Sequence, residues 1–228
     1  MFSFLGGYQL IESEHFSGCL VESTFNLENY SDQLFSQLNI LFPSQLGKAV
    51  ISRRAEFLAG RCCAHFALSQ LGMPGTKIPI GTNRCPVWPD GIQASITHTA
   101  HRALCAASKQ SHGLGIDFEV TMAHQTASEI KPNVVSSREA SVLLKSGLPL
   151  EKWLTIAFSA KESLFKALYP AVGKYFDFLD AEIIAMLPEQ QKVKFKILRD
   201  LSSRVPSGST FTGAYQPHQN GILSIVEY

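Results

Sequence analysis

Apolar residues recur at helical spacing in two long stretches of the chain. In residues 48–71 (KAVISRRAEFLAGRCCAHFALSQL), Ala, Leu and Phe return about once per helical turn, which predicts a long helix. Gly72, Pro74 and Gly75 follow directly and supply the stop signal. Residues 151–169 contain WLTIAFSAKESLFKALY and predict a second long helix.

Strand-like runs lie around these two helices. The predicted strands are 18–25, 94–99, 101–108, 113–120, 182–187, 192–198, 209–215 and 222–228. Residues 136–139 (SSRE) form a capping-box sequence and predict a short helix to about Lys145. The Pro- and Gly-rich segment 77–91 predicts a structured loop. Hairpin-like strands thus follow each long helix, which predicts an α+β fold of two similar halves that meet near residue 112.

Composition and charge narrow the function classes. The 228 residues are enough for one large domain or two small ones, and a net charge of +1 argues against binding nucleic acid with the whole surface. Any anion site must therefore be local. Five cysteines without metal-ligand spacing favour reduced thiols. The N-terminus lacks a signal-peptide pattern and no apolar run approaches ~18 residues, so we expect a cytoplasmic protein without a membrane span.

Two acidic side chains lie on one face of the predicted strand 113–120. Because side chains alternate along a strand, Asp117 and Glu119 point to one side while Ile116 and Phe118 point to the other. Their Cα atoms are expected about 6–7 Å apart, close enough for both carboxylates to bind one cation. Hard oxygen ligands favour Mg²⁺, Mn²⁺ or Ca²⁺ over zinc. The alternative is a half-exposed strand whose acids face water, as is common in antiparallel sheets.

The second long helix carries its charges in an unusual place. Between Leu154 and Tyr169 the charged residues are Lys161, Glu162 and Lys166. Lys161 and Glu162 fall within the apolar stripe and Lys166 lies at its edge. The opposite face is made of small residues: Ser159, Ala160, Ser163 and Ala167. We therefore predict a helix packed on both sides, whose ions are paired or bind a metal or anion. An i,i+4 ion pair between Glu162 and Lys166 is an alternative that leaves Lys161 unexplained.

Basic residues are spread along the first half of the chain. The set is Arg53, Arg54, Arg61, Arg84 and His98, the last of which ends a predicted strand next to Thr97. Guanidinium groups suit phosphate oxygens, so together these residues predict a phosphate-binding lining. The alternative is that each arginine is a solvated surface residue and the histidine is structural. Neither a Walker sequence nor a GxGxxG fingerprint occurs, so a bound nucleotide would not use those loops.

Four segments of the chain together resemble a known family. They are RRAEFLAGR (53–61), PVWPDGIQASITH (86–98), GIDFE (115–119) and FSAKESLFKAL (158–168). In this order and separation they resemble the surfactin- and enterobactin-type phosphopantetheinyl transferases. GIDFE followed by KESLFK is the most specific combination, and the WPDG, SITH and LAGR elements resemble most the bacterial enterobactin-like branch. Residues 1–45 match no motif of the family.

The resemblance implies a fold and a metal. The implied fold is a pseudo-twofold pair of similar α/β subdomains, residues 1–112 and 113–228, with the active site at their junction. Asp117, Glu119 and Glu162 are implied as ligands of Mg²⁺, with Mn²⁺ as an alternative metal. The implied metal also binds the pyrophosphate of coenzyme A, the co-substrate.

The resemblance also implies residues that contact coenzyme A. Lys161 and Lys166 are implied at the pyrophosphate, together with the metal held by Asp117. At the nucleotide end, the resemblance implies that Thr97 and His98 contact the phosphates. It also implies contacts with the 3′-phosphate or adenine side, made by Arg54, Arg61 and Arg84. Two positions depart from the family pattern, which often has Ser where Thr97 stands and a basic residue where Cys85 stands. The second departure leaves open whether Arg84 substitutes for that basic residue.

The implied reaction is attack by a serine hydroxyl of an apo acyl or peptidyl carrier protein on the β-phosphorus of coenzyme A, with 3′,5′-ADP leaving. Phosphoryl transfer depends on positioning and on stabilising charge on phosphate oxygens. Glu162 is the candidate general base, directly or through a metal-bound water, and Lys166 the candidate that stabilises or protonates the leaving phosphate. The implied partners are the carrier protein and coenzyme A, without nucleic acid or membrane, and we expect a monomer.

Two other functions fit the same residues. One is a different metal-dependent phosphotransferase or phosphohydrolase that uses these acids and lysines. The other is a non-catalytic module that binds coenzyme A or docks a carrier protein. The presence of Glu162 and both lysines beside GIDFE argues against the module. The carrier's pathway, whether siderophore, polyketide, polyunsaturated lipid or fatty acid synthesis, stays open.

Overall fold

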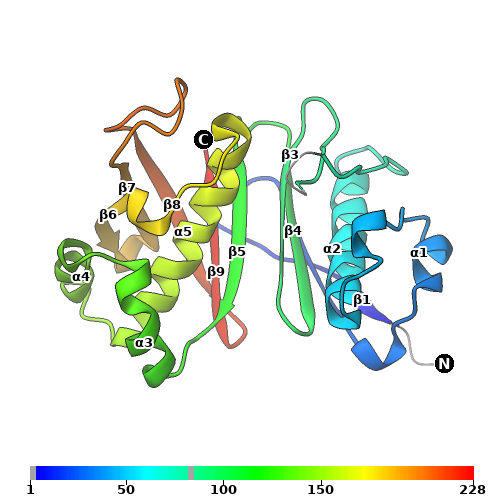
Figure 1. The fold of residues 1–228 in the computed structure, drawn as a ribbon, viewed down its shortest axis with the longest axis horizontal. Coiled ribbons are helices and arrows are strands. Elements are labelled where there is room, and N and C mark those ends of the chain that lie inside the picture. The colour runs from blue at the N-terminus through cyan, green and yellow to red at the C-terminus, as the bar shows by residue number, and fades with distance from the viewer. Residues whose placement is uncertain (1–3, 82–84) are drawn as a thin grey trace. The chain divides into compact units, whose positions relative to one another are not determined.

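Two β-sheets, each with its own helices, make up the chain (Figure 1). The computed structural model describes residues 4–81 and 85–228. They fall into two units, Met1–Ser111 and His112–Tyr228, called here the N-terminal and the C-terminal unit. The combination of helices with two antiparallel sheets confirms the predicted α+β fold class.

The N-terminal unit holds a four-stranded antiparallel sheet in the order β1-β2-β4-β3. Its strands are β1 (Leu5–Leu10), β2 (Cys19–Phe25), β3 (Gln93–His98) and β4 (Arg102–Ser108). Its α-helices are the short α1 (Gln33–Gln37) and the long α2 (Ile51–Gln70). Two short 3-10 helices, Leu27–Asn29 and Ser44–Leu46, lie between β2 and α2.

Helix α2 packs on one face of this sheet through small side chains. Strand β4 presents Ala103, Cys105 and Ala107 to the core at alternating positions. On the helix, an added Cβ at Gly60 would lie 2.8 Å from a methyl carbon of Ile96, so glycine keeps the helix close to the sheet. All five cysteines of the chain are free, as predicted.

The C-terminal unit holds a five-stranded antiparallel sheet in the order β5-β9-β8-β7-β6. Its strands are β5 (Leu114–Val120), β6 (Ala181–Leu187), β7 (Lys192–Ile197), β8 (Thr210–His218) and β9 (Gly221–Glu227). Its α-helices are α3 (His124–Val134), α4 (Ser137–Leu144) and α5 (Leu150–Val172). The 3-10 helices Phe178–Asp180 and Pro188–Gln190 flank β6.

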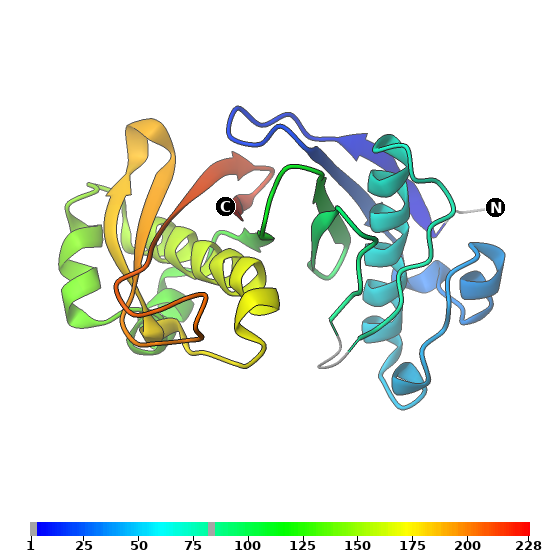
Figure 2. The same cartoon turned by 90° about the horizontal axis from the view of Figure 1, so that it is seen from above.

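Helix α5 runs across one face of the five-stranded sheet, with α3 and α4 beside it (Figures 1 and 2). The small side chains Ser159, Ser163 and Ala167 are fully buried on this helix. An added Cβ at Gly115 of β5 would overlap the carbonyl oxygen of Ser163, so helix and strand are in direct backbone contact there. The helix ends at Gly173, whose φ of 71° is left-handed and unstrained for glycine.

Most of the predicted elements are confirmed, including both long helices and the capping box that begins α4. The sequence did not predict β1, α1 or α3, and two of these omissions have a local cause. Strand β1 contains Gly6 and Gly7, which weaken a strand pattern, and α3 contains Pro132, which normally ends a helix. No helix in the described part of the chain is both long and apolar enough to cross a membrane.

Strands precede as well as follow the long helix in each unit, and the predicted strands 18–25 and 113–120 are among those that precede it. Strand β2 pairs with β4, and β5 pairs with β9, so the partners are separated in sequence by the helices. Pairing of distant strands leaves no turn signal between the partners, which is why the sequence pattern did not show it. In both cases the early strand becomes part of the sheet that the long helix covers.

Candidate functional site

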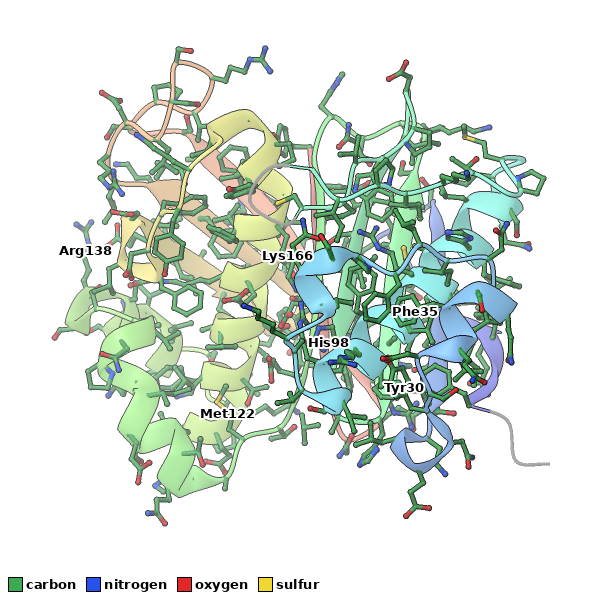
Figure 3. All side chains as sticks on the ribbon, turned by 45° about the vertical axis from the view of Figure 1, so that its right-hand side comes forward. Tyr30, Phe35, His98, Met122, Arg138 and Lys166 are labelled. Carbon is green, nitrogen blue, oxygen red and sulfur yellow. The ribbon has the colours of Figure 1, made fainter. Side chains whose placement is uncertain are left out.

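Strand β5 and helix α5 bring an acid and a lysine together. The ammonium nitrogen of Lys166, labelled in Figure 3, lies 2.8 Å from Oδ1 of Asp117 and 2.9 Å from the carbonyl oxygen of Ile116. Asp117 is 4% exposed, so the alternative of an acidic strand face in water is wrong for this residue. The carboxylate that Lys166 contacts lies on β5, so the helix needs no Glu162–Lys166 ion pair to explain its pattern.

Three buried serines form hydrogen bonds that join α5 to the sheet beside Asp117. Ser159 and Ser163 each place Oγ 2.7 Å from Oγ of Ser224 on β9. Ser159 also donates to the carbonyl oxygen of Asp117, at 3.1 Å, and Ser163 to that of Ser224, at 3.1 Å. The small face that the sequence placed opposite the ions is therefore the face that packs on β5 and β9. Sequence reasoning missed Ser224, whose partners lie far away in the chain.

Glu119 and Glu162 add negative charge around Asp117. Alternation along β5 places Glu119 on the same strand face as Asp117, as predicted. Burial, and then the charge of Asp117, raise the pKa of Glu119 to about 7, against the opposing effect of Lys166. Burial also raises the pKa of Glu162, an effect that Lys166 opposes and Asp117 reinforces. The three carboxylates therefore share one region in which full ionisation is unfavourable.

The carboxylates fit a hard cation in their chemistry. Within residues 4–81 and 85–228, no three His, Cys, Asp or Glu side chains are already arranged to hold a metal ion. Asp117, Glu119 and Glu162 nevertheless offer oxygen ligands, which Mg²⁺ and Mn²⁺ prefer. Burial is the main cause of the raised pKa values of Glu119 and Glu162, and the charge of Asp117 adds to both, so a divalent cation would favour their ionised forms. Their role as metal ligands stays a prediction.

Lys161 lies in a buried ion pair. Its ammonium nitrogen lies 2.5 Å from Oε1 of Glu139 on α4 and 2.9 Å from the carbonyl oxygens of Val134 and Phe178. Burial lowers the pKa of Lys161, and Glu139 opposes that shift. Sequence reasoning missed Glu139 as a partner, because its capping-box position indicated a role only at the start of its own helix. The predicted contact of Lys161 with pyrophosphate is not part of this arrangement and stays a prediction.

In the N-terminal unit, an arginine, a glutamate and a histidine meet at the start of α2. Nη1 of Arg53 lies 2.6 Å from Nε2 of His98, labelled in Figure 3, and 3.4 Å from Oε2 of Glu56. Nδ1 of His98 lies 3.6 Å from the same carboxylate oxygen. Because a guanidinium can only donate, Nε2 of His98 is the acceptor, and the ring proton belongs on Nδ1 toward Glu56. The arginine beside His98 is thus Arg53, which the resemblance did not single out.

Arg54 is held by contacts within the N-terminal unit. Nη1 of Arg54 lies 2.7 Å from Oδ2 of Asp32, while its Nε and Nη2 donate to the carbonyl oxygens of Ala49 and Gly47. Its guanidinium is therefore already engaged by protein acceptors. Arg84 lies outside the described residues.

Thr97 and His98 are not brought together by their side chains. They are neighbours on β3, so their side chains leave opposite faces of the sheet. His98 meets residues of α2, whereas Thr97 pairs across the sheet with Leu104, at positions that face away from α2. The period of two along a strand is the signal that could have shown this from sequence.

Arg61 is deeply buried on α2. It is 4% exposed, and its guanidinium carbon lies 4.9 Å from the centre of the Phe57 ring. Nη1 of Arg61 has no hydrogen-bond partner among the described residues. Burial lowers the pKa of Arg61 to about 10, which still leaves it charged at neutral pH. A buried cation with an unused donor is suited to binding an anion.

Both units match known proteins in sequence. A sequence model of the 4′-phosphopantetheinyl transferase N-terminal domain matches residues 42–108, and one of the 4′-phosphopantetheinyl transferase superfamily matches residues 113–212. Enterobactin synthase component D of Escherichia coli (strain K12) is 40% identical over 147 residues, which cover 64% of this chain and 69% of that protein. The chain belongs to the 4′-phosphopantetheinyl transferase superfamily.

Further members of the superfamily match over other shares of their length. Enterobactin synthase component D of Salmonella typhi is 44% identical over 126 residues, 54% of this chain and 51% of that protein, so the match spans about half of that relative. The 4′-phosphopantetheinyl transferase Svp of Streptomyces mobaraensis is 35% identical over 159 residues, 68% of this chain and 65% of that protein. These matches confirm the resemblance that the four sequence segments indicated.

Proposed function

We propose that this protein transfers the 4′-phosphopantetheine arm of coenzyme A to a serine of an apo acyl or peptidyl carrier protein and releases 3′,5′-ADP. The observation that carries the proposal is the contact between Lys166 and Asp117, because it joins the two most family-specific segments at one point. Membership of the superfamily supports the same activity, as do two relatives named 4′-phosphopantetheinyl transferase.

Asp117, Glu119 and Glu162 are the residues proposed to hold Mg²⁺, with Mn²⁺ as the alternative metal. A bound divalent cation supplies positive charge that neutralises phosphate oxygens. The raised pKa values of Glu119 and Glu162 support this assignment, since burial, and to a smaller extent the charge of Asp117, disfavour their ionised forms and a bound cation would offset this. Without a metal, Lys166 offsets part of the charge on Asp117.

Glu162 is proposed as the general base for the serine hydroxyl. Burial raises its pKa, which makes its carboxylate a stronger proton acceptor than an exposed glutamate. In the proposed step, the serine oxygen forms a bond to the β-phosphorus, and the bond from that phosphorus to the bridging oxygen breaks. The hydroxyl proton passes to Glu162, directly or through water.

Lys166 is proposed to stabilise the leaving phosphate. An ammonium group has three donors, and two of those on Lys166 are used by Asp117 and the carbonyl oxygen of Ile116. Its side chain is 27% exposed, so the third donor can reach a ligand. A cation at this point stabilises charge that develops on the leaving oxygen.

The nucleotide end of coenzyme A is proposed to contact the N-terminal unit. The unused donor of Arg61 supports its predicted role at the 3′-phosphate or adenine side. His98 is proposed at the phosphates, and the neighbouring guanidinium of Arg53 adds positive charge there. Contacts of Arg54, Arg84 and Thr97 with coenzyme A follow from the family resemblance.

The test is intact-mass spectrometry of apo carrier proteins incubated with the protein, coenzyme A and Mg²⁺. A mass increase equal to one phosphopantetheine, on a serine, is the expected result. Because relatives are named for enterobactin synthase, the panel includes a siderophore-synthase carrier besides an acyl carrier protein. Release of free phosphopantetheine without any carrier would contradict the proposal and favour a hydrolase.

A further inference from the structure

Every donor of the Lys161 ammonium is used inside the protein. A lysine ammonium carries three N–H groups and no acceptor. Those of Lys161 meet Oε1 of Glu139 and the carbonyl oxygens of Val134 and Phe178. The side chain is 1% exposed, so no donor remains for a phosphate at the surface of the unit. In this respect Lys161 differs from Lys166 on the same helix.

The carboxylate of Glu139 is equally committed. Its Oε1 also accepts from the backbone N–H of Ile183 at 2.9 Å, and its Oε2 accepts from that of Ser136 at 2.8 Å. The side chain is 2% exposed. Together with the contacts of Lys161, the pair joins α5 to the end of α3, the start of α4, the 3-10 helix Phe178–Asp180 and strand β6. Two side chains thus link five segments of the C-terminal unit.

Lys161, the member of the ion pair that lies on α5, directly precedes Glu162. Successive residues of a helix are rotated by about 100°, so a side chain fixed at one position fixes the direction of its neighbours. Lys161 points toward α4 and the 3-10 helix, whereas Lys166 points toward β5. The ion pair therefore holds one side of the helix. At the same turn, Ser159 and Ser163 hold the opposite side.

We propose that Glu139 and Lys161 are positioning residues, whose buried ion pair fixes the rotation of α5 so that Glu162 and Lys166 face the reacting phosphate, and that Lys161 itself binds no phosphate. The proposal rests on the proposed function for the identity of the reacting group. It replaces the pyrophosphate contact that the family resemblance implied for Lys161.

The first test uses the wild-type protein with inorganic pyrophosphate and Mg²⁺, and needs no variant. The side-chain ammonium signals of the lysines are followed by ¹H–¹⁵N NMR during the titration. We expect the Lys161 signal to keep its position while the Lys166 signal shifts. A shift of the Lys161 signal as large as that of Lys166 overturns the proposal. Binding seen by calorimetry with neither signal shifted supports the proposal for Lys161 and contradicts the role of Lys166 in the proposed function.

The second test is a double-mutant cycle of Lys161→Met, Glu139→Gln and both together. Gln at 139 can still accept at the helix cap, and Met fills most of the volume of Lys. We expect kcat to fall by about 10- to 100-fold in each single variant, since a displacement of about 1 Å can cost about 100-fold. The double variant should be no slower than the slower single, because the pair acts as a unit.

Affinity for coenzyme A separates the two roles of Lys161. Positioning predicts dissociation constants for coenzyme A, measured with Mg²⁺ by calorimetry, within about 3-fold of wild type in all three variants, because no ligand contact is removed. Binding at least about 10-fold weaker in Lys161→Met but normal in Glu139→Gln would identify a lost charged contact and overturn the proposal. Wild-type protein that binds coenzyme A but transfers nothing contradicts the proposed function, while the NMR result still decides the role of Lys161.

A control distinguishes positioning from a general loss of stability. Val193 is buried on β7 in the same hydrophobic core, and Val193→Ala removes two methyl groups far from the ion pair in sequence. Assays are run well below the melting temperature of every variant. We expect Val193→Ala to melt earlier and keep its kcat. An equal loss of kcat in Val193→Ala and Lys161→Met would overturn the proposal.

Discussion

Both long helices carry a buried cation, Arg61 on α2 and Lys161 on α5, and the two differ in how their donors are used. Lys161 has three protein acceptors, one of them a carboxylate. Arg61 lies against an aromatic ring, and its Nη1 has no partner within the described residues. Burial lowers the pKa of both groups, so depth alone does not separate them.

This difference distinguishes a buried cation that stabilises the fold from one that is suited to binding a ligand. A cation whose donors are all used contributes to the fold, because removing it leaves its partners unsatisfied. A cation with an unused donor lowers stability and is expected to persist where a ligand completes it. On this basis Lys161 belongs to the architecture of the C-terminal unit, and Arg61 is the buried cation for which we propose a ligand.

The largest expected effect is a difference in stability between two matched variants. Lys161→Met leaves the carboxylate of Glu139 buried without its counter-ion and should lower the free energy of unfolding by about 3–5 kcal/mol. Arg61→Met removes a partly unsatisfied cation and should leave stability unchanged or higher, since such a donor costs about 1–3 kcal/mol. Urea unfolding without ligands measures both. Similar losses in the two variants would show that the comparison is wrong.

The next-largest effect concerns the proposed catalytic role of Glu162, which directly follows Lys161 on α5. Glu162→Gln keeps the shape but removes the charge proposed for metal and proton transfer, so transfer should fall by at least about 100-fold. The melting temperature without metal should stay level or rise, because the raised pKa of Glu162 indicates a carboxylate that is unfavourable when ionised. Glu151→Gln, in the first turn of the same helix, is the control and should transfer normally. Near-normal transfer by Glu162→Gln would remove this residue from the mechanism.

A smaller effect tests the open donor of Arg61. Arg61→Met should weaken binding of coenzyme A by about 10-fold through loss of one charged contact. Arg54→Met is the matched control and should lose less, because Arg54 is engaged by Asp32 and two carbonyl oxygens. Calorimetry with coenzyme A and with dephospho-coenzyme A provides the measurement. If Arg61 holds the 3′-phosphate, its loss matters less for the dephospho ligand, and an equal loss for both ligands excludes that contact.

The smallest expected effect is a change in the pH dependence of stability. The folded-state pKa of Glu119, about 7, lies above its usual value, so the folded protein binds this proton more tightly than the unfolded chain does. The resulting stability is present below the unfolded pKa near 4.5 and is lost as pH rises through 7. In metal-free buffer, Glu119→Gln should therefore melt later than wild type at pH 8 and similarly at pH 4.5. The same difference at both pH values would contradict the assignment.

The sequence contained most of the information needed for α5. Its charges inside an apolar stripe predicted a helix packed on both sides, and Ser159, Lys161 and Ser163 are indeed buried. The alternation of GIDFE predicted that Asp117 and Glu119 share a face. These properties depend on the local period of a helix or a strand, which the sequence carries directly.

The partners of these residues could not be read in the same way. Glu139, Ser224 and Arg53 make their contacts across 22, 61 to 65 and 45 residues of sequence, respectively. Such contacts depend on how whole elements pack, and a helical or strand period says nothing about which elements meet. Lys161 is the clearest case, because its sequence pattern fits both a contact with a ligand and the buried ion pair with Glu139.

Gly115 has a consequence for how far this part of the protein can be altered. An added Cβ there would overlap the carbonyl oxygen of Ser163, one helical turn from Lys166, while Asp117 follows two residues along the strand. Any larger residue must push α5 away from β5 and so stretch the 2.8 Å contact between Lys166 and Asp117. Gly115, the first residue of GIDFE, is thus needed for the space that it leaves to α5 and not for any chemical group. In designed or diverged variants, the acids and the lysine keep their spacing only while this one position carries no side chain at all.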